Sequence, residues 1–172
     1  MKIAHISDIH VRNYKYHHEY REVFQQLFDK LKELKPDIIV NTGDTAHTKS
    51  ILSPEYFNLT SWLFTGLAEI APLHMILGNH DCNVKNSSRL DAITPITEAL
   101  EDPNIHFHKH TKEVDLGENI VLNVLSILDQ DKWSAPSDPN KTNLALYHGA
   151  VAGSKTDTGW IMEHGEIDLE FL

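Results

Sequence analysis

Apolar periodicity and helix-start signals predict three helices within the first 100 residues. Between Val23 and Leu34, apolar side chains recur every three or four positions, which is the spacing of one buried helix face. Ser53 followed by Pro54 is typical of a helix start, because serine caps the first turn and proline fits its first position. Pro95 is expected to shorten or kink the third helix. The predicted helices cover residues 18–34, 54–70 and 88 or 89 to 100.

Short apolar runs predict strands between and after these helices. The predicted strands cover residues 2–7, 37–40, 73–77, 105–108, 113–116, 120–127 and 143–147. Strand and helix alternate in the first half, which favours parallel strands, and the second half is rich in strands. The pattern predicts an α/β fold in which two packed mixed β-sheets are flanked by helices. His106, His108 and His110 alternate along one strand, and we interpret them as an exposed edge because no carboxylate accompanies them.

Four predicted strands run directly into polar residues that can bind metal. The first strand leads to Asp8 and His10, the second to Asp44, the third to Asn79 and the last to His148. In open α/β sheets, ligands bind beyond the carboxyl ends of parallel strands, and those ends share one edge of the sheet. We therefore expect these side chains to surround one crevice.

Carboxylate, amide and imidazole groups form a mixed oxygen and nitrogen set that suits Mn²⁺, Fe²⁺ or Zn²⁺. Asp44 is the best placed carboxylate to bridge two ions, and a pair of ions about 3.5–4 Å apart can clamp a phosphoryl group and activate water. Glycines at positions 43, 78 and 149 allow sharp turns and close backbone approach beside these ligands. The sequence therefore predicts a centre for two divalent ions.

Composition narrows the function classes. The 172 residues suit one domain, and the formal net charge of -10 with 12 histidines favours metal ions over an extended DNA groove. Cys82 is the only cysteine, so an intracellular, cytoplasmic location is expected. We recognise neither a secretory signal nor an apolar stretch long enough to span a membrane.

The order of the motifs along the chain is distinctive: Asp8-x-His10, Gly43-Asp44, Gly78-Asn79-His80-Asp81 and then His148. This series resembles that of the calcineurin-like metallophosphoesterases, which implies their four-layer sandwich fold over residues 1–172. The finer pattern is similar to the SbcD family of DNA double-strand-break repair nucleases. The segments similar to that family are Lys2 to His10, Gly43 to His47 and Tyr147 to Val151.

The resemblance implies a role for each metal ligand. Asp8 and His10 would bind the first ion, Asp44 would bridge, and Asn79 and His148 would bind the second. Two divalent ions would be the cofactors, with Mn²⁺ as the expected metal and Fe²⁺ or Zn²⁺ as alternatives.

The resemblance also implies roles around the substrate. His80 would stabilise charge or protonate the leaving oxygen, with Asp81 orienting its ring. His47 would contact the phosphate or assist the leaving group. Arg12 and Asn13, just after the first motif, are candidates for contacts to a DNA backbone.

The implied activity is exonuclease and single-strand endonuclease cleavage of DNA by water activated between two metals. The implied partners are DNA, an SMC-like ATPase of the SbcC type, and a second copy in a homodimer. The family also carries a late Gly-x-His motif that is missing here, because His164 lies in Glu163-His164-Gly165. We therefore expect a C-terminally truncated domain without that motif or the C-terminal capping domain. Two alternatives remain open: another phosphodiesterase or phosphatase, and a catalytically weak scaffold.

Overall fold

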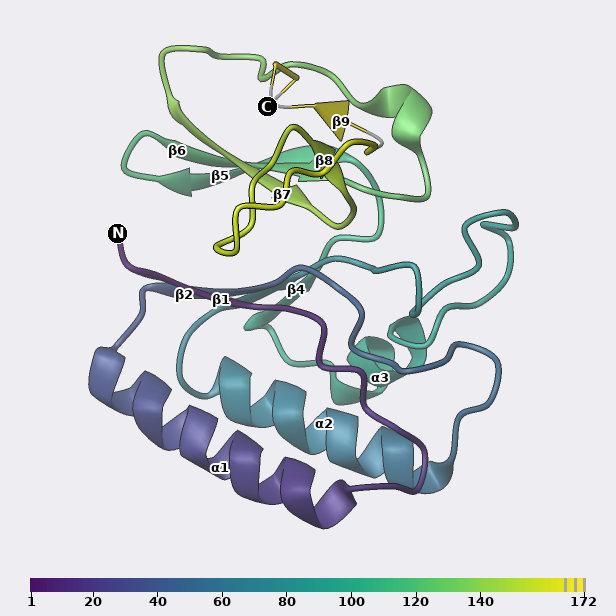
Figure 1. Cartoon of the computed structure of the whole chain (residues 1–172). Coiled ribbons are helices and arrows are strands. Elements are labelled where there is room, and N and C mark those ends of the chain that lie inside the picture. The colour runs from purple at the N-terminus through teal and green to yellow at the C-terminus, as the bar shows by residue number, and fades with distance from the viewer. Residues whose placement is uncertain (166, 169, 172) are drawn as a thin grey trace. The chain divides into compact units, whose positions relative to one another are not determined.

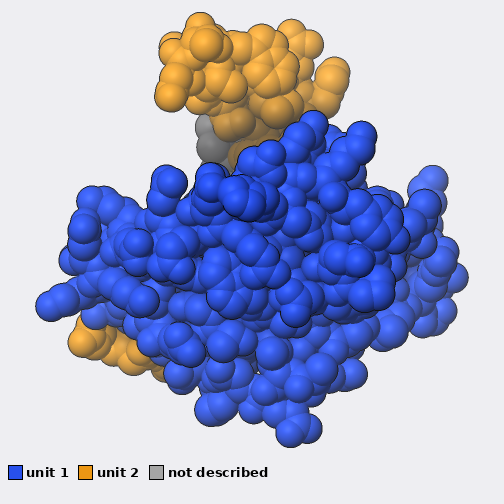
Figure 2. Space-filling model, turned by 90° about the horizontal axis from the view of Figure 1, so that it is seen from below, with its two compact units in different colours: residues 1–109 blue, residues 110–172 orange. Residues whose placement is uncertain are grey.

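The computed structural model describes residues 1–165, 167–168 and 170–171. The chain divides into two units, Met1–Lys109 and His110–Leu172, which Figure 2 colours separately. We call them the first and the second unit and describe each by itself.

The sheet of the first unit contains four parallel strands in the order β1-β2-β3-β4 (Figure 1). They are β1 (Ile3–Ile6), β2 (Ile38–Asn41), β3 (Leu73–Met75) and β4 (Ile105–Phe107). Ile6 pairs with Asn41, Asn41 with Met75, and Met75 with Phe107. The four carboxyl ends therefore lie in one row, and the loops that follow them leave from the same edge of the sheet.

Two long helices, α1 (His17–Leu34) and α2 (Pro54–Ala68), lie side by side along one side of this sheet (Figure 1). The Oγ of Ser53 accepts the backbone N–H of Tyr56 at 3.2 Å, so the predicted cap starts α2. Their packing faces are largely aromatic and aliphatic, which anchors the helices to the sheet. The buried apolar residues of α1 and α2 are Phe24, Phe28, Leu31, Tyr56, Leu59, Leu63, Phe64, Leu67 and Ala68.

The third helix is shorter than predicted, because α3 covers only Thr94–Leu100. The carboxylate of Asp91 accepts the backbone N–H groups of Ile93 at 2.9 Å and of Thr94 at 2.6 Å. The helix therefore starts just before Pro95, where the missing N–H costs nothing. The prediction of helix from residue 88 or 89 was wrong for this reason.

The sheet of the second unit is mixed. It contains β5 (Lys112–Gly117), β6 (Ile120–Leu125) and β7 (Thr142–Tyr147), with β5 antiparallel and β7 parallel to β6. Glu118 and Asn119 have φ values of 50° and 63°, as a tight hairpin turn of this twist requires. The remaining elements are a 3₁₀ turn, η1 (Gln130–Lys132), and the parallel pair β8 (Val151–Ala152) and β9 (Ile167–Asp168).

The interpretation of the alternating histidines was wrong for His108. Its side chain is buried, and its Nε2 lies 2.9 Å from Nδ1 of His74. His74 belongs to the neighbouring strand β3. His106 stacks on His74 with ring centroids 4.6 Å apart. No described helix combines the length and the apolar character needed to cross a membrane.

Candidate metal centre

The loops after β1 and β2 remain in register beyond the end of the sheet. The backbone N–H of Asp8 donates to Gly43 O at 3.0 Å, that of His10 to Asp44 O at 3.0 Å, and that of Val11 to Thr45 O at 2.8 Å. These bonds keep the two loops paired over several residues beyond the strands. They place the first two predicted motifs beside each other.

Three of the predicted ligands have left-handed backbone conformations. The φ values are 54° at Asp8, 50° at His10 and 53° at Asp44. Such conformations cost a residue with a Cβ about 1–3 kcal/mol, and they occur at turns, at helix ends and at functional sites. The conformation turns each of these side chains out of the strand direction, and the three converge on one another.

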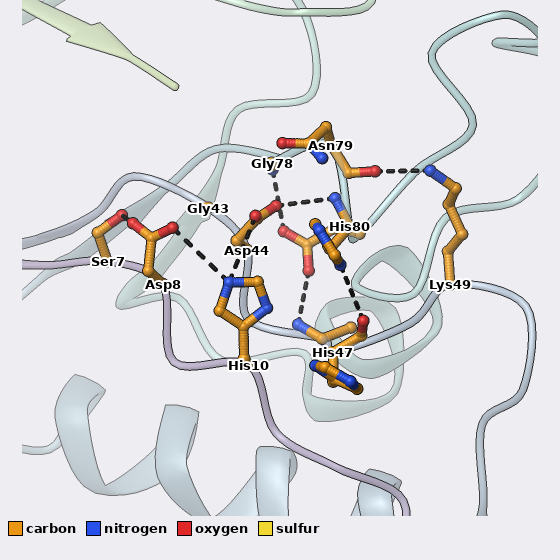
Figure 3. Close-up of polar contacts among 12 residues, drawn as sticks. Ser7, Asp8, His10, Gly43, Asp44, His47, Lys49, Gly78, Asn79 and His80 are labelled. Atoms are coloured by element: carbon orange, nitrogen blue, oxygen red, sulfur yellow. Dashed lines mark hydrogen bonds and ion pairs between the residues drawn. The ribbon is translucent and has the colours of Figure 1, made fainter. Parts of the chain in front are cut away.

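The donor atoms of these three residues lie at the separations expected around an ion. The Nε2 of His10 is 3.8 Å from Oδ1 of Asp8 and 3.6 Å from Oδ2 of Asp44 (Figure 3). These distances are too long for hydrogen bonds. His10, Asp44 and His80 also offer ligand atoms that all lie within 4.8 Å of one another. The donor set is carboxylate and imidazole, so it fits a divalent cation of the Mn²⁺, Fe²⁺ or Zn²⁺ kind.

Asp44 is the central carboxylate of this centre. Its side chain is only 5% exposed, while that of Asp8 is 60% exposed. One carboxylate oxygen, Oδ1, accepts the backbone N–H of His80 at 2.8 Å, and the other, Oδ2, faces His10. The loop after β3 therefore fixes the orientation of the carboxylate that we predicted to bridge.

Gly78 makes this close approach possible. A Cβ at Gly78 would collide with Oδ1 and the backbone N of Asp44, and a Cβ at Gly43 would collide with the backbone of Gly78. The two predicted glycines thus let three loops meet at the position of Asp44.

Gly78→Ala is therefore expected to destabilise the protein by about 2 kcal/mol and to weaken Mn²⁺ binding at least about tenfold. The added methyl group forces Asp44 away from His10 because backbone atoms on both sides cannot yield cheaply. Chemical denaturation and calorimetric titration with Mn²⁺ measure the two effects. Gly117→Ala is the control for metal binding: its new Cβ has open space, and although the φ of 78° strains an alanine and costs stability, Mn²⁺ affinity should be kept.

His80 is held by the loop after β2 rather than by its neighbour. Its Nδ1 lies 2.8 Å from the backbone O of His47, and a carbonyl oxygen can only accept, so Nδ1 carries a proton. In the neutral ring the lone pair is then at Nε2. The ring centroid of His80 lies 4.8 Å from that of His10, which directs His80 toward the metal ligands (Figure 3).

Asp81 does not orient the ring of His80, so that prediction was wrong. Its carboxylate is completely buried and accepts the backbone N–H of Ala46 at 2.7 Å and that of Gly78 at 2.9 Å. Burial, followed by the charge of Asp44, raises the pKa of Asp81 to about 6 against the opposing effect of these hydrogen bonds. Asp81 is therefore an internal brace that ties the loop after β3 to the loop after β2.

His47 lies beside both other histidines. Its ring centroid is 5.8 Å from that of His10 and 6.2 Å from that of His80. Loss of hydration lowers the pKa of His47, and the positive charges of Arg12, His10 and His80 lower it further. His47 and Arg12 are therefore electrostatic neighbours at the edge of the centre.

The remaining predicted site residues are Asn79, Asn13, Arg12 and His148. Asn79 is in the loop after β3, where its backbone O accepts a hydrogen bond from Lys49 Nζ at 2.6 Å. Asn13 donates its side-chain amide to Ile51 O at 2.5 Å, so this amide ties two loops together. Contacts of Arg12 and Asn13 with DNA stay predictions. His148 follows β7 in the second unit, and its part in the centre also stays a prediction.

Sequence reasoning missed Lys49. It lies two residues after His47, outside every motif, and a single lysine in a polar loop carries no recognisable signal. Only the folded loop places its ammonium group against the third motif (Figure 3).

Comparison with known proteins agrees with this geometry. The sequence model of the calcineurin-like phosphoesterase family matches residues 1–168 of the chain. The chain is also 40% identical, over 182 aligned positions, to an uncharacterized protein of Acanthamoeba polyphaga mimivirus. That alignment covers 98% of the chain but only 13% of the viral protein. The chain thus spans about an eighth of the length of this relative.

Proposed function

The chain belongs to the calcineurin-like phosphoesterase family of metal-dependent phosphoester hydrolases, and we propose that its substrate is DNA. The proposed reaction is hydrolysis of phosphodiester bonds, as an exonuclease and single-strand endonuclease of the SbcD type acting in double-strand-break repair. A pair of divalent ions, when bound, would neutralise the scissile phosphate and lower the pKa of water. All other steps depend on the residues of the chain.

The cluster of His10, His47 and His80 is the observation that carries the proposal. Cleavage of DNA expels a sugar hydroxyl, which is a poor leaving group and needs a proton. His80 can supply this proton from Nε2 when the ring is protonated, because its Nδ1 is fixed on the carbonyl of His47. Phosphodiester cleavage in DNA therefore makes direct use of this arrangement.

The side chains of the centre divide the remaining tasks. Asp8, His10 and Asp44 would bind one ion. Asp44 would also bind a second ion, whose other proposed ligands are Asn79 and His148. Arg12, whose charge acts on His47, would provide a cation near the scissile phosphate. Partnership with an SMC-like ATPase and formation of a homodimer are parts of the proposal that come from the sequence resemblance.

The net charge of -10 favours a second candidate function. An acidic protein repels an extended polyanion, so a nucleotide phosphodiesterase or phosphatase with a small substrate is the alternative. A catalytically weak scaffold, the other alternative from the sequence, is the third possibility.

One assay separates these functions. The protein is incubated with Mn²⁺ and labelled single- or double-stranded DNA, and in parallel with a small chromogenic phosphodiester. We expect cleavage of DNA that disappears in a variant of Asp44. Turnover of the small ester alone would identify the second function, and inertness toward both substrates would identify the scaffold.

A further inference from the structure

A small pocket lies next to the candidate metal centre in the first unit. Its volume is about 270 Å³. The residues that line it are His47, Thr48, Lys49, Ser50, Asn79 and His80. Asn79 and His80 belong to the third motif, so the pocket begins where the proposed scissile phosphate would lie.

The lining of the pocket suits an anion. It contains an ammonium group, two hydroxyl groups and two imidazole rings, and none of its residues is acidic. This is unusual in a chain with 25 acidic and 15 basic residues. The pocket is therefore a local exception to the overall charge.

Lys49 is fixed toward this pocket. Its Nζ donates one hydrogen bond, of 2.6 Å, to the backbone O of Asn79 (Figure 3). An ammonium group has three N–H donors, so two remain for an acceptor in the pocket. Because the bond to Asn79 already restrains the long side chain, little further entropy is lost when an anion binds.

We infer that Lys49 binds a second phosphate of the substrate, next to the scissile one. The inference rests on the proposed function and specifies its substrate class, because only a substrate with successive phosphates can fill both positions. A nucleic-acid strand meets this condition, and a lone phosphomonoester does not. Lys49 is thus a specificity-determining residue that favours substrates with at least two successive phosphates, such as a nucleic-acid strand.

A purely structural role for Lys49 predicts different behaviour. If it served only to hold the backbone of Asn79, its loss would affect all substrates equally and would weaken binding of Mn²⁺. Lys49→Gln separates the two roles, because its amide keeps N–H donors for a hydrogen bond but carries no charge. Lys49→Arg keeps the charge.

The test compares a thymidine dinucleotide that has one phosphodiester with the same dinucleotide carrying an additional terminal phosphate. We expect the protein to prefer the additional phosphate about tenfold in kcat/KM, since charge-assisted hydrogen bonds have this magnitude. Lys49→Ala and Lys49→Gln should lose most of this preference, and Lys49→Arg should keep it. Lys32→Ala, an exposed lysine in the last turn of α1, is the matched control.

Binding gives a second measurement that does not depend on turnover. Phosphorothioate analogues of both dinucleotides and Mn²⁺ are titrated by calorimetry into the protein and its variants. Loss of the preference for the additional phosphate, with Mn²⁺ affinity intact, supports the inference. Equal losses on both dinucleotides, or a preference unchanged in Lys49→Ala, overturn it. If the protein cleaves no labelled DNA in the assay above, the proposed function fails, and the binding preference still decides the role of Lys49.

Discussion

Asp44→Asn is expected to reduce phosphodiester hydrolysis by at least about a thousandfold and to weaken Mn²⁺ binding strongly. The substitution keeps the shape of the side chain. The amide oxygen can still accept the backbone N–H of His80, which Asp44 Oδ1 accepts at 2.8 Å. The amide nitrogen then faces His10 in place of the charged oxygen, which stands 3.6 Å from His10 Nε2. An N–H group cannot bind a cation, so the proposed bridge between two ions would be lost.

Mn²⁺ stoichiometry by calorimetry and turnover of the chromogenic diester measure this loss. Asp29→Asn removes the same charge from the exposed face of α1 and should behave as the unchanged protein. Circular dichroism checks that the variant folds. Retention of two tightly bound ions by folded Asp44→Asn protein would show that Asp44 is not the bridging ligand.

The convergence of the first three motifs could be predicted from the sequence because it depends on simple rules. Parallel strands linked by helices end at one edge, and the register that aligns Ile6, Asn41 and Met75 brings the three motifs together. The helices α1 and α2 were also predictable, since apolar spacing and the Ser53 cap are local signals. These predictions required no knowledge of side-chain partners.

The partners themselves could not be predicted, because tertiary contacts choose them. Asp81 follows His80 in the sequence, yet its carboxylate points to the backbone of Ala46 and Gly78. The approach of the loops after β2 and β3 leaves buried N–H groups that need an acceptor, and Asp81 is the acceptor within reach. The hydrogen bond between His74 and His108 depends in the same way on the pairing of β3 with β4.

His80→Ala is expected to slow cleavage of DNA by about a hundredfold to a thousandfold, the usual contribution of general acid catalysis. The geometry motivates this expectation: the His47 carbonyl holds Nδ1 at 2.8 Å, so Nε2 is the atom that we propose transfers the proton, beside the ring of His10. A chromogenic ester expels a phenolate that needs no proton, so its hydrolysis should fall far less. His18→Ala, an exposed histidine on α1, is the control for loss of an imidazole.

The ratio of the two losses distinguishes an acid from a ligand. His80 also lies within reach of an ion together with His10 and Asp44. If His80 were chiefly a metal ligand, its removal would lower turnover of DNA and of the chromogenic ester by the same factor and would reduce Mn²⁺ stoichiometry. If it is the acid, both ions remain bound and only the substrate with the poor leaving group is cleaved slowly. Because Nδ1 is hydrogen-bonded to the His47 carbonyl, only Nε2 can bind a metal or transfer a proton. The ratio of the two activity losses and the Mn²⁺ stoichiometry together show which of these roles Nε2 has.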